Sequence, residues 1–475
     1  RRGLGELARA PQIVAPPPQA LPLERAALEP LDRRRAGGTP RQPAAQRVPA
    51  PEQCLVGQRA GVGRAVVVRG GHHHQPAADQ RLERRLAAEE VDRGYARAVA
   101  ALDAALEIAP GDAGARARRC DIVYERALIA ERDFQRDRVA DLVEALAACD
   151  AGGQRRRRWH APAALTVEVV PANATVTLDA YHPDGLRLVA RPHGPPGPAP
   201  FATTAPPGSY VITARAPGHA TVHLPLLLAR GERRTERLTL PAAAAIPAGF
   251  VLIPAGRFRY GSDDVDEELR RVYWNTSPLH EITTPAYLIG RHEVTYADWI
   301  AWLEALPEAA RGPLLPRTGA KAFIAGPDFG LTPAPGGRWR FRFRRADHVY
   351  EALDGEPITY RDRDRRQVQD WRRFPVAGVS YEDGLAYAAW LDATGRVPGA
   401  HLCTDVEWER AARGADGRRY PNGARLAPDD ANIDETYGRQ TLAFGPDEVG
   451  AHPASRSPFG VDDLAGNVWE WVTAI

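Results

Sequence analysis

The sequence predicts a multidomain α+β protein with a helical region, a region of short strands and a C-terminal region of mixed structure. The chain has 475 residues, enough for about two to four domains at ~100–200 residues each. Apolar residues recur at three- and four-residue spacings between residues 81 and 150, and at every second residue between 165 and 240. The first spacing is typical of helices and the second of strands.

The charge balance bears on the kind of partner. The 62 basic and 60 acidic residues leave a net charge of +2, well short of the positive surface that nucleic-acid-binding proteins use. A single lysine, Lys321, accompanies the arginines, a bias typical of GC-rich coding sequence. We therefore expect a protein or peptide partner and no nucleic acid.

Both ends of the sequence read like interior sequence. The chain opens on Arg1, contains no methionine and closes just after "WEW", so we expect a fragment of a longer bacterial protein. No run approaches the ~20 apolar residues that span a bilayer, and no secretion signal is recognisable. We expect a cytoplasmic location and no membrane span within this stretch.

The cysteines are few and scattered. They stand at Cys54, Cys120, Cys149 and Cys403, and none forms a C-x-x-C pair. This spacing predicts neither a zinc site nor a disulfide framework.

Residues 1–80 are predicted to be low-complexity and disordered. Stretches such as "RRRAGGTPRQPAAQ" hold short apolar runs that keep no period. His72, His73 and His74 are a candidate metal-binding group, but no second ligand cluster lies nearby to complete a site. A solvated loop, or mistranslated upstream sequence, is the favoured interpretation.

Residues 81–150 are predicted to be helical, with a turn at "APGD". The stretch "AVAALDAALEIAPGDAGARAR" resembles the second helix and connecting turn of a tetratricopeptide repeat. One such unit cannot bury its own apolar face, so a neighbouring helix such as 136–148 must stack on it. Peptide binding and a helical spacer are the two interpretations, and the spacer is favoured.

Residues 165–240 are predicted to form a small β-sandwich. Alternating apolar residues are interrupted by turns at Pro171, 207–208 and 217–218. The stretch resembles a PEGA-type β-domain, although the turn that begins at Pro171 reads Pro-Ala-Asn-Ala and departs from the usual pattern. The arginine run at 155–158 is predicted to be a solvated linker rather than a phosphate site.

Residues 249–475 carry a succession of ordered blocks after an alanine- and proline-rich linker, 240–249. The blocks run from "GFVLIPAGRFRYGS" through "HLCTDVEWERAARG" and "YPNGARLAPDDANID" to "SPFGVDDLAGNVWEWV". Their order resembles the formylglycine-generating enzyme family, also called the sulfatase-modifying factor family. The resemblance implies a C-type-lectin-like fold with little regular structure, whose buried loops need ions or side chains as polar partners.

Two helices in this region are predicted from local signals. In "SYEDGLAYAAWL", Ser380 suits an N-terminal cap, and Ala386, Ala389 and Trp390 share the predicted buried face.

The second predicted helix lies in "CTDVEWERAARG". Thr404 and Glu407 form a capping box, and Gly414 ends the helix. Capping is favoured over catalysis for Glu407. The preceding Cys403 is predicted to be a buried structural thiol, because no histidine partner is evident in the motif.

The resemblance implies a structural calcium site in "GNVWEW". Its ligands map onto Gly466, Asn467, Val468 and Glu470. Oxygen ligands of this kind suit a hard cation such as calcium. The alternative is that the two tryptophans are core residues and Glu470 pairs with an arginine.

A second calcium site is implied at an "AN-I" turn, which matches Asn432 and Ile433. Its further carboxylate ligand is missing, because the matching position lies near Thr441 and is not an aspartate. The second site is therefore weaker than the first.

The resemblance also implies an activity. Members of the family oxidise a peptidyl cysteine to formylglycine with oxygen and copper, through a cysteine pair beyond the "GNVWEW" block. None of the four cysteines stands in that place, so we predict no catalytic residue here, an inactive polypeptide, and copper only in a complete homologue.

Two alternatives remain open. The first is a non-catalytic recognition module of a signalling protein, with a Ser/Thr kinase upstream. The second is an iron-dependent enzyme that forms carbon–sulfur bonds, which the lack of a histidine-rich ligand spacing in residues 81–475 disfavours.

Overall fold

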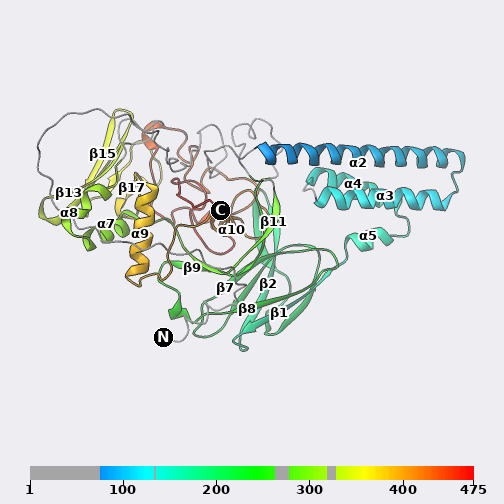
Figure 1. Cartoon of the computed structure of the whole chain (residues 1–475), viewed down its shortest axis with the longest axis horizontal. Helices are drawn as coiled ribbons and strands as arrows, with labels where there is room; N and C mark the ends of the chain where they lie inside the picture. The colour runs from blue at the N-terminus through cyan, green and yellow to red at the C-terminus, as the bar shows by residue number, and fades with distance from the viewer. Residues whose placement is uncertain (1–74, 133–134, 263–276, 278, 318–327, 475) are drawn as a thin grey trace, which may run out of the picture. The chain divides into compact units, whose positions relative to one another are not determined.

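The computed structural model describes residues 75–132, 135–262, 277, 279–317 and 328–474 (Figure 1). Helices and sheets are both present. The predicted low-complexity segment, apart from residues 75–80, lies outside these ranges, as do the histidine run and Cys54. Within the described ranges, the helices are too short or too polar to cross a membrane.

The helical region begins at Gln75, ahead of the predicted boundary. Its helices are α2 (Gln75–Ile108), α3 (Ala113–Arg132), α4 (Arg136–Cys149) and α5 (Gln154–Trp159). The first three lie side by side (Figure 1). At the "APGD" turn, the Asp112 carboxylate accepts hydrogen bonds from the amides of Gly114 (2.7 Å) and Ala115 (3.0 Å) and so starts α3.

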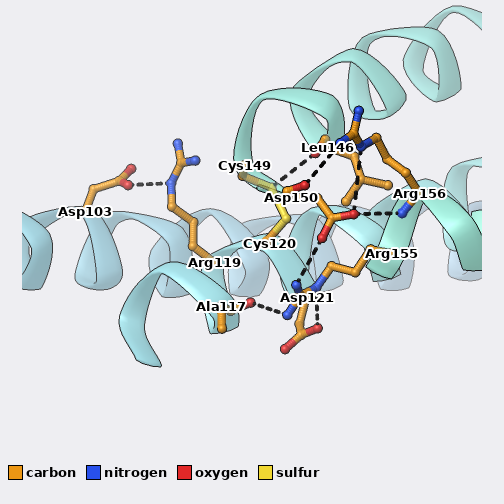
Figure 2. The surroundings of a disulfide bond; sticks show 10 residues. All are labelled: Asp103, Ala117, Arg119, Cys120, Asp121, Leu146, Cys149, Asp150, Arg155 and Arg156. Carbon is orange, nitrogen blue, oxygen red and sulfur yellow. Dashed lines mark hydrogen bonds and ion pairs between the residues drawn. A yellow bond between two sulfur atoms is a disulfide. The ribbon is translucent and has the colours of Figure 1, made fainter. Parts of the chain in front are cut away.

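A disulfide joins α3 to the end of α4 (Figure 2). Cys120 and Cys149 are 29 residues apart in sequence, and their Cα atoms lie 5.6 Å apart. The prediction that the cysteines form no disulfide is therefore wrong for this pair. Spacing along the chain did not reveal the pair because it is the packing of α4 back along α3 that brings the two cysteines together.

The segment after the disulfide is helical rather than a free linker. The Asp150 side chain, 1% exposed, accepts a hydrogen bond from the Arg156 amide at 2.9 Å. Arg155 donates to Asp121 at 2.7 Å and to the Ala117 carbonyl at 2.9 Å (Figure 2). The prediction of a solvated arginine run is wrong for Arg155, which ties α5 to α3.

The strand region contains two sheets. Its strands are β1 (Ala163–Val170), β2 (Thr175–Asp184), β3 (Arg187–Pro192), β4 (Gly197–Pro198), β5 (Phe201–Ala205), β6 (Gly208–Arg215), β7 (Val222–Leu228) and β8 (Arg233–Thr239). One sheet has the order β5-β1-β8, with β1 and β8 parallel. The other has the order β3-β2-β6-β7, with β4 added to β2. Alternate residues of β1 are buried, and buried residues from both sheets form one apolar cluster.

The C-terminal region is built from short strands and a few helices. Its strands are β9 (Phe250–Ile253), β10 (Gly256–Tyr260), β11 (His280–Thr284), β12 (Tyr287–Gly290), β13 (Asp328–Ala334), β14 (Arg338–Arg345), β15 (His348–Leu353), β16 (Ile358–Thr359) and β17 (Val368–Gln369). Its α-helices are α7 (Tyr296–Ala305), α8 (Glu308–Arg311), α9 (Tyr381–Ala393) and α10 (Asp405–Arg413). Short 3₁₀ helices are η1 (Ala243–Ala245, in the predicted linker), η2 (Gly312–Leu314), η3 (Pro335–Gly337), η4 (Trp371–Arg373), η5 (Thr441–Ala443) and η6 (Pro453–Ser455).

The predicted helix caps are confirmed. Ser380 opens α9 and Thr404 opens α10, each with a capping box, and Gly414 follows the end of α10 with φ +70°.

The predicted buried face of α9 is wrong for its two alanines but right for Trp390, which is half-buried and packs against the apolar cluster of this region. Ala386 and Ala389 are exposed, whereas Ala388 is buried. The packing face is set by Tyr387, which stacks on Trp299 of α7 with ring centroids 5.4 Å apart. The aromatic contact therefore rotates α9 away from the orientation that its alanines suggested.

Beyond α10, the chain from 414 to 474 runs through turns and loops with only η5 and η6 as helical elements and no named strand. These loops nevertheless bury charged residues, among them Asp430, Asp447, His452 and Asp463. Buried charges need polar partners, and those partners build the candidate site.

Candidate functional site

The structure brings the two predicted cation motifs together. Gly466 has φ +82°, and a side chain on it would collide with the Asn432 carbonyl oxygen. The Asn467 amide donates to that same carbonyl at 2.9 Å. Glycine is therefore required where the "GNVWEW" loop passes the Asn432 turn.

Asn467 joins several loops through its side chain. Its Oδ1 accepts hydrogen bonds from Asn432 Nδ2 at 3.1 Å and from the Asp447 amide at 2.9 Å. Its Nδ2 donates to Glu293 Oε1 and to the Asp447 carbonyl, both at 3.3 Å. Asn467 itself has φ +62°, a left-handed conformation that asparagine tolerates better than most residues.

Glu470 and its neighbouring tryptophans contradict the alternative of a plain core. Glu470 Oε1 accepts a hydrogen bond from Trp408 Nε1 at 3.1 Å, and among the described residues no arginine forms an ion pair with Glu470. Trp469 is 52% exposed. Trp471 is half-buried and donates to the Val379 carbonyl at 3.1 Å.

Two further acidic residues, Glu293 and Asp463, lie close enough to Glu470 to interact with it electrostatically, and sequence reasoning missed both. Burial and the charges of Asp463 and Glu470 hold the pKa of Glu293 well above its usual range. Burial also raises the pKa of Asp463. Burial, with the Asp463 charge, raises the pKa of Glu470 to about 7. Glu293 Oε2 is buried and has no hydrogen-bond partner.

This loop fits a hard cation. Unpaired buried carboxylates are costly unless a positive charge balances them, and every potential ligand near Asn467 is an oxygen. Within the described ranges, no three His, Cys, Asp or Glu side chains converge into a metal-holding group. The Asn467 Oδ1 already accepts two hydrogen bonds. A cation here would therefore depend on Glu470 and on main-chain oxygens such as that of Val468, rather than on a ring of carboxylates.

The Asn432–Ile433 turn makes several hydrogen bonds within the protein. Asn432 Nδ2 donates to the Gly445 carbonyl at 2.9 Å. The Ile433 carbonyl accepts from the Thr436 amide at 3.1 Å. Thr441 begins η5 and supplies no carboxylate. The Asn432 side-chain nitrogen and the Ile433 carbonyl are therefore engaged within the protein.

Asp447 is the carboxylate that the structure places beside this turn. Its Oδ1 accepts from Arg363 Nη1 at 2.5 Å and from Gln369 Nε2 at 2.7 Å. Its Oδ2 is bonded to Tyr437 Oη at 2.6 Å and to His452 Nε2 at 2.7 Å. Burial acts to raise the pKa of Asp447, but the His452 hydrogen bond and the Arg363 charge outweigh it and lower the pKa to about 2.

The cysteines offer one free thiol among the residues that the structure describes. That thiol belongs to Cys403. Burial, with the charges of Glu470 and Glu407, raises the pKa of Cys403 to about 12, so the thiol stays protonated and unreactive at neutral pH. This supports the interpretation of Cys403 as a structural residue.

Comparison with known proteins adds a family. Residues 237–475 match the family described as "Sulfatase-modifying factor enzyme 1-like domain". The hercynine oxygenase of Mycobacterium tuberculosis is 32% identical over 286 residues, which cover 56% of this chain and 57% of that protein. The formylglycine-generating enzyme of the same organism is 31% identical over 47% of this chain and 73% of that enzyme. A protein of Bos taurus named inactive C-alpha-formylglycine-generating enzyme 2 is 28% identical over 47% of this chain and 70% of its own length.

Proposed function

Because this chain belongs to the family of sulfatase-modifying factor enzyme 1-like domains, we propose that residues 237–475 form the calcium-stabilised scaffold of a formylglycine-generating domain. We further propose that the polypeptide as printed does not itself oxidise a peptidyl cysteine. Catalytic and copper-binding residues are accordingly assigned to none of its side chains.

The state of the cysteines carries this proposal. The reaction of the family needs reactive thiolates, since the thiolate is the form that binds copper and exchanges with a substrate sulfur. Cys120 and Cys149 are held in the disulfide. Cys403 is kept protonated by its buried position. The thiols of the described residues therefore supply no reactive pair.

Calcium is proposed for the "GNVWEW" loop alone. The observation in support is the buried, unpartnered Glu293 Oε2 beside Glu470 and Asp463, whose pKa values are all raised. A bound calcium ion would supply positive charge that stabilises the ionised carboxylates. Glu470 would hold it, together with main-chain oxygens of Gly466 and Val468, while the Asn467 side chain keeps the loop in place through its hydrogen bonds to Asn432 and Asp447.

Mass spectrometry of a peptide containing Cys-x-Pro-x-Arg tests the proposed inactivity. The full chain, incubated with the peptide, copper and oxygen, should leave the thiol unchanged, while an active family member converts it to the aldehyde under the same conditions. Aldehyde formation that depends on this chain would overturn the assignment.

The second candidate function is a recognition module without catalysis, attached to tetratricopeptide-like and PEGA-like regions in a signalling protein that also carries a kinase. The Bos taurus relative favours this second function, because that protein resembles this chain and is named as an inactive formylglycine-generating enzyme. Peptide capture by the chain, without chemical change of the peptide, is the expected behaviour.

The disulfide bears on location. The sequence favoured the cytoplasm, but disulfides persist in oxidising compartments and are rare in reducing ones. We propose that the helical region is exposed to an oxidising compartment. Thiol labelling of the protein isolated from its native cells under acid quench should leave Cys120 and Cys149 unlabelled; labelling of both would restore the cytoplasmic interpretation.

A further inference from the structure

The loop 443–447 wraps around a buried guanidinium. Arg363 lies between β16 and β17, and its side chain is 0% exposed. Its Nε donates to the Ala443 carbonyl at 2.7 Å, and its Nη2 donates to the Gly445 carbonyl at 3.1 Å. Its Nη1 donates to Asp447 Oδ1 at 2.5 Å. Nη1 also donates to the Arg366 carbonyl at 3.5 Å. Three main-chain oxygens and one carboxylate thus converge on one positive charge, as they would on a metal ion.

The same oxygens border the turn that was predicted to bind calcium. The Gly445 carbonyl accepts from both Arg363 Nη2 and Asn432 Nδ2. Asp447 is linked to this turn through Asn467. The Asp447 amide and Asn432 Nδ2 both donate to Asn467 Oδ1. The guanidinium and the Asn432 side chain are therefore joined through one shared carbonyl, that of Gly445.

Two aromatic rings enclose the charge. The guanidinium carbon lies 3.4 Å from the Tyr360 ring centroid and 3.9 Å from that of Tyr437. Such contacts favour a planar cation over a spherical one.

The ion pair is also saturated with hydrogen bonds. Asp447 accepts from Gln369 and bonds to Tyr437 and His452 through its remaining lone pairs. Arg363 has a carboxylate, three carbonyls and two rings around it. A buried pair is tolerated when its remaining polar atoms are satisfied in this way, and no carboxylate oxygen is left over for a metal ion.

We propose that Arg363 is an internal replacement for the second calcium ion, so that the Asn432–Ile433 turn is held by a guanidinium and needs no metal. The missing aspartate near Thr441 then has a physical reason. With the charge supplied by Arg363 and balanced by Asp447, a further carboxylate would be unpaired. This inference rests on the proposed scaffold, but it does not depend on whether the "GNVWEW" loop binds calcium.

Calcium stoichiometry tests the inference in the full chain. After chelation and equilibrium dialysis with calcium, we expect one bound ion per chain or none. If one ion binds, Glu470→Gln should release it. Two ions on the unaltered chain, or one ion that stays bound in the Glu470→Gln variant, would overturn the inference. No bound ion would refute the proposed calcium loop while leaving the inference about Arg363 intact.

Chemical rescue provides an independent measurement. Arg363→Ala should lower the melting temperature of the C-terminal region by about 10 °C, and millimolar guanidinium chloride should restore a large part of that loss by filling the space left between the two tyrosines. Arg340→Ala, which removes a 43% exposed arginine that pairs with Glu351 on a neighbouring strand, is the matched control and should show neither effect. Equal responses of the two variants to guanidinium would overturn the inference. If Arg363→Ala does not fold, the stoichiometry of the unaltered chain still decides.

Discussion

The helical region and the C-terminal region are held together by different means. In the helical region, few side chains are fully buried, and a covalent bond between α3 and α4 compensates for the small core. In the C-terminal region, long loops are held by buried ions and amides, with Asp447 and Asn467 each bonded to several segments. A chain segment with little regular structure therefore needs polar partners at defined positions, whereas packed helices need only to be kept in contact.

The consequence is a different sensitivity to single changes. A disulfide acts mainly on the unfolded chain, so its removal lowers stability without leaving a charge in the interior. Removal of one member of a buried ion pair leaves the other uncompensated. The C-terminal region should therefore be the more sensitive of the two to one substitution.

The largest effect is expected for Asp447→Ala. The change leaves the Arg363 guanidinium buried without its counter-charge, and we expect a loss of about 3–5 kcal/mol in the free energy of unfolding of the C-terminal region. Denaturant unfolding followed by tryptophan fluorescence measures it. Glu351→Ala, which removes a 42% exposed partner of Arg340, is the control and should cost at most about 1 kcal/mol. Similar losses for both variants would mean that the Asp447 network contributes little.

Loss of the disulfide should come next. Cys120→Ala together with Cys149→Ala should lower the stability of the helical region by about 2–4 kcal/mol, given the 29-residue separation. Loss of helical circular dichroism on heating would report on the helical region, and tryptophan emission would report mainly on the C-terminal region. A double variant that melts like the unaltered chain would show that helix packing alone holds α3 against α4.

Local rules account for the parts that the sequence predicted well. The N-terminal cap at Ser380 and the capping box at Thr404 were predicted because each depends on residues within one helical turn. The alternation of β1 was predicted because strand periodicity is equally local. The "GNVWEW" loop was singled out only through resemblance to a family, since no period marks it.

The parts that sequence reasoning missed depend on contacts between distant positions. Glu293 meets Asn467 across 174 residues, and Arg363 meets Asp447 across 84. Irregular loops have no periodicity that would bring such residues into register. The Cys120–Cys149 disulfide was missed for the same reason. The two cysteines come into bonding distance only when α3 and α4 pack together.

Calcium should give a smaller, adjustable effect on the C-terminal region alone. At a free concentration 100 times its dissociation constant, a bound ion adds about 2.7 kcal/mol to the free energy of unfolding. Glu470→Gln should abolish this response and, in calcium-free buffer, should raise the melting temperature slightly, because one of the mutually repelling carboxylates is removed.

The control for this experiment is Glu435→Gln, which changes a side chain that is 41% exposed and paired with Arg439. It should keep the calcium response. Identical melting curves of the unaltered chain in calcium and in chelator would refute the calcium loop, and the buried carboxylates would then have to be held protonated.

The smallest predicted effect compares how a helix begins in each region. The Thr404 hydroxyl accepts from the Glu407 amide at 3.1 Å, and the Glu407 carboxylate accepts from the Thr404 amide at 2.9 Å. Gln135, which precedes α4, makes no such side-chain cap. Thr404→Ala should therefore cost about 1 kcal/mol, while Gln135→Ala should change stability by only a few tenths of a kcal/mol. Thr404→Ser should retain most of the stability, because serine caps as well as threonine. Both sites lie at helix starts. If Gln135→Ala lowered the free energy of unfolding as much as Thr404→Ala, the loss would come from substitution at a helix start in general. The capping hydrogen bonds of Thr404 would then not be its cause.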